Sequence, residues 1–192
     1  RGSSYADASG VQASAYNAAT VTNNAGGQIA ATAMYGDAIG LLVVGYTPDV
    51  SNTGSVSALG STSATGIQAQ GYLSASVLTT GSVSAYAYGE AYGVFAIAGD
   101  TSTIRNNGDI TATSMMGDAI GELAVAGLTA ITTNGGDTTV DNTGYIRGSS
   151  YADASGVQAS AYNAATVTNN AGGQIAATAM YGDAIGLLVV GY

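Results

Sequence analysis

Acidic side chains recur at one position of a repeated motif, directly before the tripeptide Ala-x-Gly. This position is occupied in chain order by Asp7, Asp37, Ser63, Glu90, Asp118, Asp153 and Asp183. If copies of the motif stack as neighbouring strands, their carboxylates approach to about 5 Å, where like charges repel unless a cation screens them. Because Ca²⁺ prefers oxygen ligands, Glu90, Asp118, Asp153 and Asp183 are candidate calcium ligands. We favour the alternative that each acid caps its own turn and faces water, since the Gly-Gly-x-Gly-x-Asp repeat of calcium-binding solenoids does not occur.

Catalysis is the second chemistry that carboxylates could perform, as they do in polysaccharide-cleaving enzymes that pair them with a basic residue. The chain has no His, no Cys and no Lys, and its distinct basic residues are Arg105 and Arg147, because Arg1 is a copy of Arg147. The many Ser and Thr hydroxyls therefore lack an evident base. We expect no enzymatic activity, no catalytic residue and no cofactor.

The charge balance excludes several kinds of partner. Three Lys+Arg residues against 12 Asp+Glu give a formal net charge of −9, which disfavours nucleic acid and anionic membrane surfaces. Uninterrupted apolar runs such as Leu41–Val44 are far below the length of about 20 residues that spans a bilayer. The absence of Cys excludes a disulfide framework.

Long internal repetition organises the chain. Residues 1–46 recur letter for letter as residues 147–192. We interpret residues 1–146 as one full tandem repeat, residues 147–192 as the start of the next identical repeat, and residues 1–192 as one continuous solenoid.

A shorter, degenerate period divides each repeat into modules of about 27 residues. The modules, or coils, begin at Val21, Val50, Val77, Ile104 and Val140, and the next begins at Val167. Each opens on a β-branched residue, passes through a polar pair to Gly, and reaches a second β-branched residue. Two modules are longer, and we place their insertions at residues 24–27 and 129–136, which are rich in turn-forming residues.

Alternation of small and polar residues with a period of two predicts three short strands in each module. Such a module cannot bury its apolar face alone, so we expect an all-β fold, a parallel three-sided β-helix in which each module forms one coil. The predicted inward residues are Ile29, Ala31, Ala33, Val56, Ala58, Gly60, Val83, Ala85, Ala87, Ile110, Ala112 and Ser114. A recurring amide should stack inside as a ladder that satisfies the turn backbone. Its predicted members are Asn23, Asn52, Asn106, Asn142 and Asn169, with Thr79 in the third coil.

Apolar residues also fall at positions that we expect to face outward. Leu41 and Val43 occupy them in one coil, and Phe95 and Ile97 two coils later, where other coils have Gln or Ser. Together with the Tyr86 and Tyr88 pair, they suggest a lateral docking surface. The alternative is a register error of one residue, which exchanges inside and outside.

Two phrases carry a resemblance to a known family. Residues 106–112 (Asn-Asn-Gly-Asp-Ile-Thr-Ala) and 116–121 (Met-Gly-Asp-Ala-Ile-Gly) resemble the coils of autotransporter-type and filamentous-haemagglutinin-like adhesins, which Gram-negative bacteria secrete. The resemblance implies a right-handed β-helix stalk that is extracellular or on the cell surface and has no enzymatic activity.

We therefore predict a structural, adhesive solenoid that forms a stalk, a filament or a biofilm matrix. Its expected partners are further copies of itself, joined by repeat stacking or by lateral or end-to-end association. The alternative is an ice- or glycan-binding module, which needs regular Thr-x-Thr ranks. The sequence offers only fragments of such ranks, at residues 101–103 and 111–113.

Overall fold

The computed structural model describes residues 1–127, 129–134, 145–150, 152–170 and 172–191. Every regular element in these ranges is a β-strand, and all recorded strand pairs are parallel. Within the same ranges, no helix is long and apolar enough to cross a membrane. The chain is a parallel three-sided β-solenoid, as the sequence predicts.

The strands form three sheets, and consecutive strands of the chain pass from sheet A to sheet B to sheet C. Sheet A stacks β1 (Gly2–Ser4), β4 (Gln28–Ala33), β7 (Ser55–Gly60), β10 (Ser82–Ala87), β13 (Asp109–Ser114), β16 (Tyr145–Ser150) and β19 (Gln174–Ala179). Sheet B stacks β2 (Ala8–Ser14), β5 (Ala38–Gly45), β8 (Ser63–Gly71), β11 (Glu90–Ala98), β14 (Ala119–Ala126), β17 (Ala154–Ala161) and β20 (Ala184–Gly191). Sheet C stacks β3 (Thr20–Asn23), β6 (Asp49–Asn52), β9 (Ser74–Thr79), β12 (Thr101–Asn106), β15 (Thr129–Asn134) and β18 (Ala164–Asn169).

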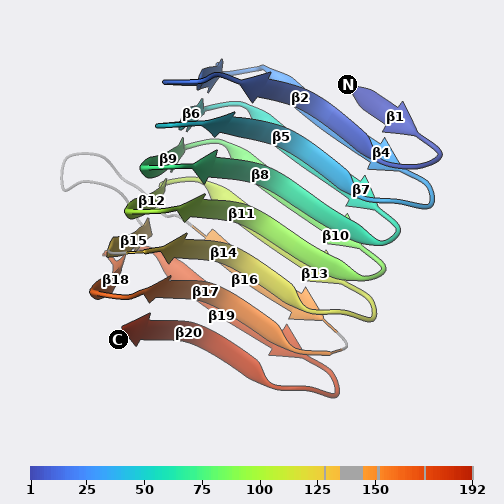
Figure 1. Cartoon of the computed structure of the whole chain (residues 1–192). Coiled ribbons are helices and arrows are strands. Elements are labelled where there is room, and N and C mark those ends of the chain that lie inside the picture. The colour runs from blue at the N-terminus through green and yellow to red at the C-terminus, as the bar shows by residue number, and fades with distance from the viewer. Residues whose placement is uncertain (128, 135–144, 151, 171, 192) are drawn as a thin grey trace.

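Equivalent positions of successive coils lie directly over each other. Val50 pairs with Val77, and Val77 with Ile104, in sheet C. In Figure 1 the coils accordingly follow one another in a single direction, from the blue N-terminal end to the red C-terminal end. The molecule therefore grows along one axis by the addition of coils.

Two kinds of inward column fill the interior. Val56, Val83 and Ile110 form one aliphatic column in sheet A and are each at most 1% exposed. Beside it lies a column of alanines, which includes Ala58, Ala85 and Ala112 and belongs to a second apolar cluster. The predicted inward residues are confirmed as buried, except that Ile29, in the second strand of sheet A, is only partly buried. Small side chains let sheets A and B approach closely, while the aliphatic column fills the wider part of the interior.

The glycine of the Ala-x-Gly motif lies in sheet B, packed directly against the aliphatic column of sheet A. A Cβ atom on Gly93 would lie 2.4 Å from Ile110 Cγ2 and 2.5 Å from the carbonyl oxygen of Gly121 in the next coil. Gly40 and Gly66 meet the same kinds of neighbour. A side chain at this position would force the sheets apart, which explains why the motif requires glycine.

The insertions fall differently from the sequence prediction in one of the two long coils. The shorter insertion forms the expected turn, in which the Gly27 N–H donates to the Asn24 carbonyl at 2.8 Å. The longer one was wrongly placed at 129–136, because Thr129–Asn134 forms β15. Thr132 pairs with Ile104 and with Val167, so the coil that we began at Val140 has its sheet C strand earlier in the chain.

The boundary between the two tandem repeats leaves no break in the stack. β16 pairs with β13, β17 with β14, and β18 with β15, in the same parallel arrangement as the coils within a repeat. The second copy of the repeat therefore continues the three sheets of the first.

Candidate functional site

The acidic position before Ala-x-Gly forms a column at the turns that join sheet A to sheet B. All of its acidic members are exposed. Asp7 Oδ1 accepts a hydrogen bond from the backbone N–H of Asp37 at 3.0 Å, and Asp153 Oδ1 accepts one from the N–H of Asp183 at 2.9 Å. These carboxylates thus cap the turn of the next coil, where the sequence suggested that each would cap its own.

The acidic column does not assemble a visible ligand set for calcium. Among the residues that the structure describes, no group of three or more Asp or Glu side chains could hold a metal ion. Glu90 Oε2 instead accepts a hydrogen bond from the Tyr92 hydroxyl at 2.9 Å. Burial, this hydrogen bond, and the nearby charges of Glu90 and Asp118 raise the pKa of Tyr92 to about 12. Arg105, which a catalytic role would pair with an acid, lies on β12 in sheet C, away from this column.

The polar ladder lies at the inner side of the turns after sheet C. Asn23 Nδ2 donates to Asn52 Oδ1 at 2.8 Å, and Asn52 Nδ2 donates to Thr79 Oγ1 at 3.0 Å. Asn52 and Thr79 are fully buried, so these side chains satisfy one another inside the solenoid.

Two further members of the ladder bond to turn backbone. Asn106 Oδ1 accepts from the Gly108 N–H at 2.9 Å, and Asn169 Nδ2 donates to the Gly173 carbonyl at 3.0 Å. Asn142 lies outside the described residues. The position in register with Asn106 and Asn169 is held by Asn134 in this coil.

The apolar surface predicted from the sequence needs a correction in its first coil. Leu41 and Val43 point inward and are fully buried, while Leu42 and Val44 face outward and are half-buried. Leu42 and Phe95 both pair with Gln68, and Val44 and Ile97 both pair with Gln70. All four residues of the run Leu41–Val44 are apolar, so alternation alone could not tell the two faces apart.

The outer face of sheet B therefore carries an apolar patch that sequence reasoning located in part. Phe95 and Ile97 are half-buried on this face, and the Phe95 ring stacks on the Tyr92 ring with centroids 5.9 Å apart. Tyr86 and Tyr88 are 43% and 55% exposed. Tyr86 pairs with Leu59 in sheet A, so these tyrosines do not share the face with Phe95.

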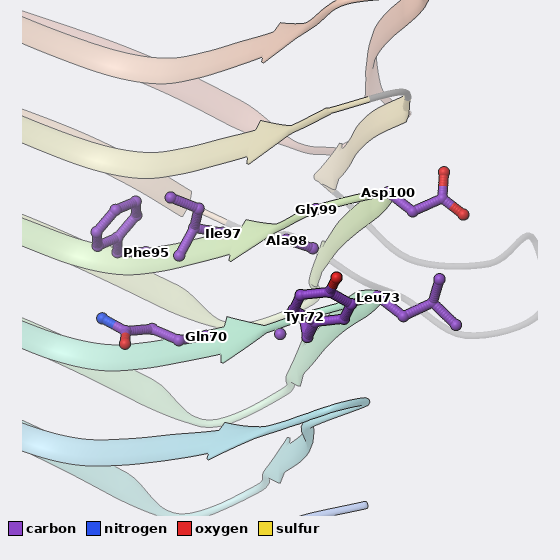
Figure 2. Close-up of a pocket in the computed structure, with 9 residues that line it drawn as sticks. Gln70, Tyr72, Leu73, Phe95, Ile97, Ala98, Gly99 and Asp100 are labelled. Carbon is purple, nitrogen blue, oxygen red and sulfur yellow. The ribbon is translucent and has the colours of Figure 1, made fainter. Parts of the chain in front are cut away.

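An open depression borders this patch where sheet B turns into sheet C. Its lining includes Gln70, Tyr72, Leu73, Phe95 and Ile97, with Asp100 as its charged member. Figure 2 shows these side chains coming from two successive coils and from the turns that follow them. The depression is thus continuous with the apolar face of sheet B.

Glu122 is the unusual residue that sequence reasoning missed. It lies on β14 in register with Val94 and Val157, in an inward aliphatic column of sheet B, and is fully buried. Neither of its carboxylate oxygens has a hydrogen-bond partner in the described part of the chain. Burial raises the pKa of Glu122 well above its ordinary value. Alignment of the Ala-x-Gly motifs would have revealed it, because the residue after this glycine is aliphatic in the other coils.

Comparison of the chain with protein-family models, with curated proteins and with solved structures gave no match. The structure itself defines the class of the protein, which is a parallel β-solenoid with a tandem sequence repeat.

Proposed function

We propose that this chain is a structural module of an extracellular or cell-surface rod, a stalk or filament whose function comes from its length and its repeated surface. The observation that carries the proposal is the unbroken stacking across the repeat boundary, where β16, β17 and β18 continue the sheets of the preceding repeat. Because each coil contacts mainly its neighbours, further repeats extend the rod without a new interface.

The chemistry of the surface supports a role in structure and adhesion over catalysis. Two of the exposed acids, Asp7 and Asp153, cap the turn of the next coil, and recurring amides such as Asn23 and Asn52 hydrogen-bond to each other in the internal ladder. Thr111 and Thr113 lie beside Ser84 and Tyr86 of the preceding coil, so the threonine ranks of an ice-binding face do not extend through these coils. The resemblance to secreted adhesin coils agrees with a stalk outside the cell.

Electron microscopy of chains that carry one, two and four copies of residues 1–146 tests this role. Each copy contains five coils and should lengthen the particle by about 24 Å at strand spacing, with no change in width. Particles that grow equally in all directions would refute the rod. Adhesion is tested separately, by measuring whether beads coated with these chains bind glass, chitin or epithelial cells more strongly as the copy number rises.

A further inference from the structure

The outer face of sheet B carries two neighbouring columns of outward side chains. The first column is Gln12, Leu42, Gln68, Phe95, Leu123, Gln158 and Leu188. The second is Ser14, Val44, Gln70, Ile97, Val125, Ser160 and Val190. Every residue in both columns is uncharged, although the chain has a net charge of −9. Each coil thus contributes a row of two outward side chains to a charge-free face. The row is apolar in the coils that contain Leu42, Phe95, Leu123 and Leu188, and it carries Gln or Ser in the others.

We propose that two copies of the chain pair side by side through this face, with their long axes parallel. The proposal rests on the proposed rod and names its lateral partner, a second copy. Two molecules of the same net charge repel, so the face without charged side chains is the surface on which they can approach most closely. Burial of the half-exposed Phe95, Ile97, Leu123 and Val125 would supply the attraction.

The acidic column selects the parallel orientation. Asp7, Asp37, Glu90, Asp118 and Asp153 line one edge of the face, at or just before the first residue of each sheet B strand. In an antiparallel pair, these edges of the two copies would lie opposite each other, and the carboxylates would repel. In a parallel pair related by a twofold axis along the rod, the acidic edges lie on opposite sides.

The parallel pair also matches the rows along its whole length. Each coil then faces the same coil of the other copy, with the two columns exchanged by the twofold axis. Phe95 of one copy faces Ile97 of the other, and Gln68 faces Gln70, so apolar rows meet apolar rows and amides meet amides. This register persists however many repeats are added.

The area of the face suits a stable pair. Seven strands about 4.8 Å apart span about 29 Å, and strands of eight or nine residues span about 27 Å. The face of one copy therefore measures about 800 Å², which equals the area that each partner contributes to a standard protein interface. Because the pair joins two negatively charged molecules without ion pairs, added salt should strengthen it.

Sedimentation equilibrium of the 192-residue chain tests the pairing. We expect a monomer–dimer equilibrium, and the double variant Phe95→Gln/Ile97→Gln should raise its Kd at least about tenfold. This variant copies the Gln68/Gln70 row that the fold already holds at the same register, so circular dichroism should stay unchanged. The control variants Leu59→Gln and Leu78→Gln remove exposed apolar residues from sheets A and C and should leave the Kd unchanged.

Cross-linking tests the orientation, because the chain has no Cys. Gln12→Cys lies in the first strand of sheet B. A short bismaleimide should join two copies of this variant in a parallel pair and fail in an antiparallel one. A chain that stays monomeric, or a dimer that Phe95→Gln/Ile97→Gln leaves unchanged, would overturn the pairing, and a failure to cross-link would overturn the orientation. The rod itself would survive each of these results, since its length is measured independently.

Discussion

Replacement of Glu122 by valine should stabilise the protein. Glu122 lies between Val94 and Val157 in an inward aliphatic column, is fully buried, and has two carboxylate oxygens without a partner among the described residues. An unsatisfied buried polar group costs about 1–3 kcal/mol. Valine is close to glutamate in volume and matches both neighbours in the column, so Glu122→Val should raise the free energy of unfolding by about 1–3 kcal/mol at neutral pH.

The pH dependence of stability gives the sharper result. Because burial raises the folded-state pKa of Glu122, the folded protein holds this proton more tightly than the unfolded chain does. The contribution of Glu122 to stability is therefore fully present below the unfolded pKa of about 4.3 and declines by up to about 1.4 kcal/mol per pH unit as the pH rises toward the folded pKa. Glu122→Val should abolish this decline.

Urea unfolding followed by circular dichroism, between about pH 4 and about pH 8, measures both effects around the unfolded pKa of glutamate. Glu122→Gln is the matched control, because it removes the titration but leaves an unsatisfied amide, and should flatten the pH profile with a smaller gain in stability. The reasoning is refuted if Glu122→Val is less stable than the original chain at neutral pH, or if its stability keeps the original pH slope.

Three further sets of substitutions test the glycine contacts, the polar ladder and the Tyr92 hydrogen bond. Gly93→Ala should lower the free energy of unfolding by about 1–3 kcal/mol through overpacking. Gly186→Ala, at a position with nothing within 4 Å of the added Cβ, should change it little. Equal urea midpoints for these two variants would contradict the close approach of sheets A and B. Asn52→Leu removes the ladder hydrogen bonds that Asn52 makes with Asn23 and Thr79 and should cost about 1–3 kcal/mol. Asn52→Thr should cost less in the same assay because threonine already serves at Thr79, and the reverse order would argue against the ladder. The Tyr92 phenol should ionise near its raised pKa of about 12 in an ultraviolet titration, and the stability of the protein should fall as the pH rises from about 10 toward that value. Glu90→Gln should lower the pKa of Tyr92. An unchanged pKa in this variant would exclude the hydrogen bond between the two side chains.

The sequence predicts the solenoid well wherever small and apolar residues alternate clearly. In the strands that contain Val56, Val83 and Ile110, β-branched and small residues alternate with mostly polar ones, so the inward positions follow from the period of two. The register of successive coils follows from the same residues, because a slip of one position would bury the polar face.

The prediction failed where two alternatives satisfied the same pattern. The run Leu41–Val44 is apolar on both faces. Only its pairing with the strand at Ile67–Gln70, in which apolar residues alternate with glutamines, decides that Leu41 points inward. In the fifth coil, Asn134 and Asn142 each follow a β-branched residue at the same spacing, and stacking on β12 selects Asn134.

The lateral face could be seen only in part from the sequence. Gln68 and Gln70 showed which positions face outward in one coil, and Phe95 and Ile97 showed that apolar residues can replace them. That Leu42, Phe95 and Leu123 belong to one column depends on turns of unequal length, which residue spacing does not resolve. The acidic edge that orients the proposed pair likewise emerges from the arrangement of the turns.

The central claim is that equivalent positions of successive coils stack directly over each other at strand spacing. Ala30, Ser57, Ser84 and Ala176 belong to one outward column of sheet A, and the absence of Cys allows spin labels to be placed in pairs. Electron paramagnetic resonance should give distances from position 176 of about 14 Å to position 84, about 19 Å to position 57 and about 24 Å to position 30, in equal steps per coil. Distances that do not rise in equal steps would contradict the stacked solenoid.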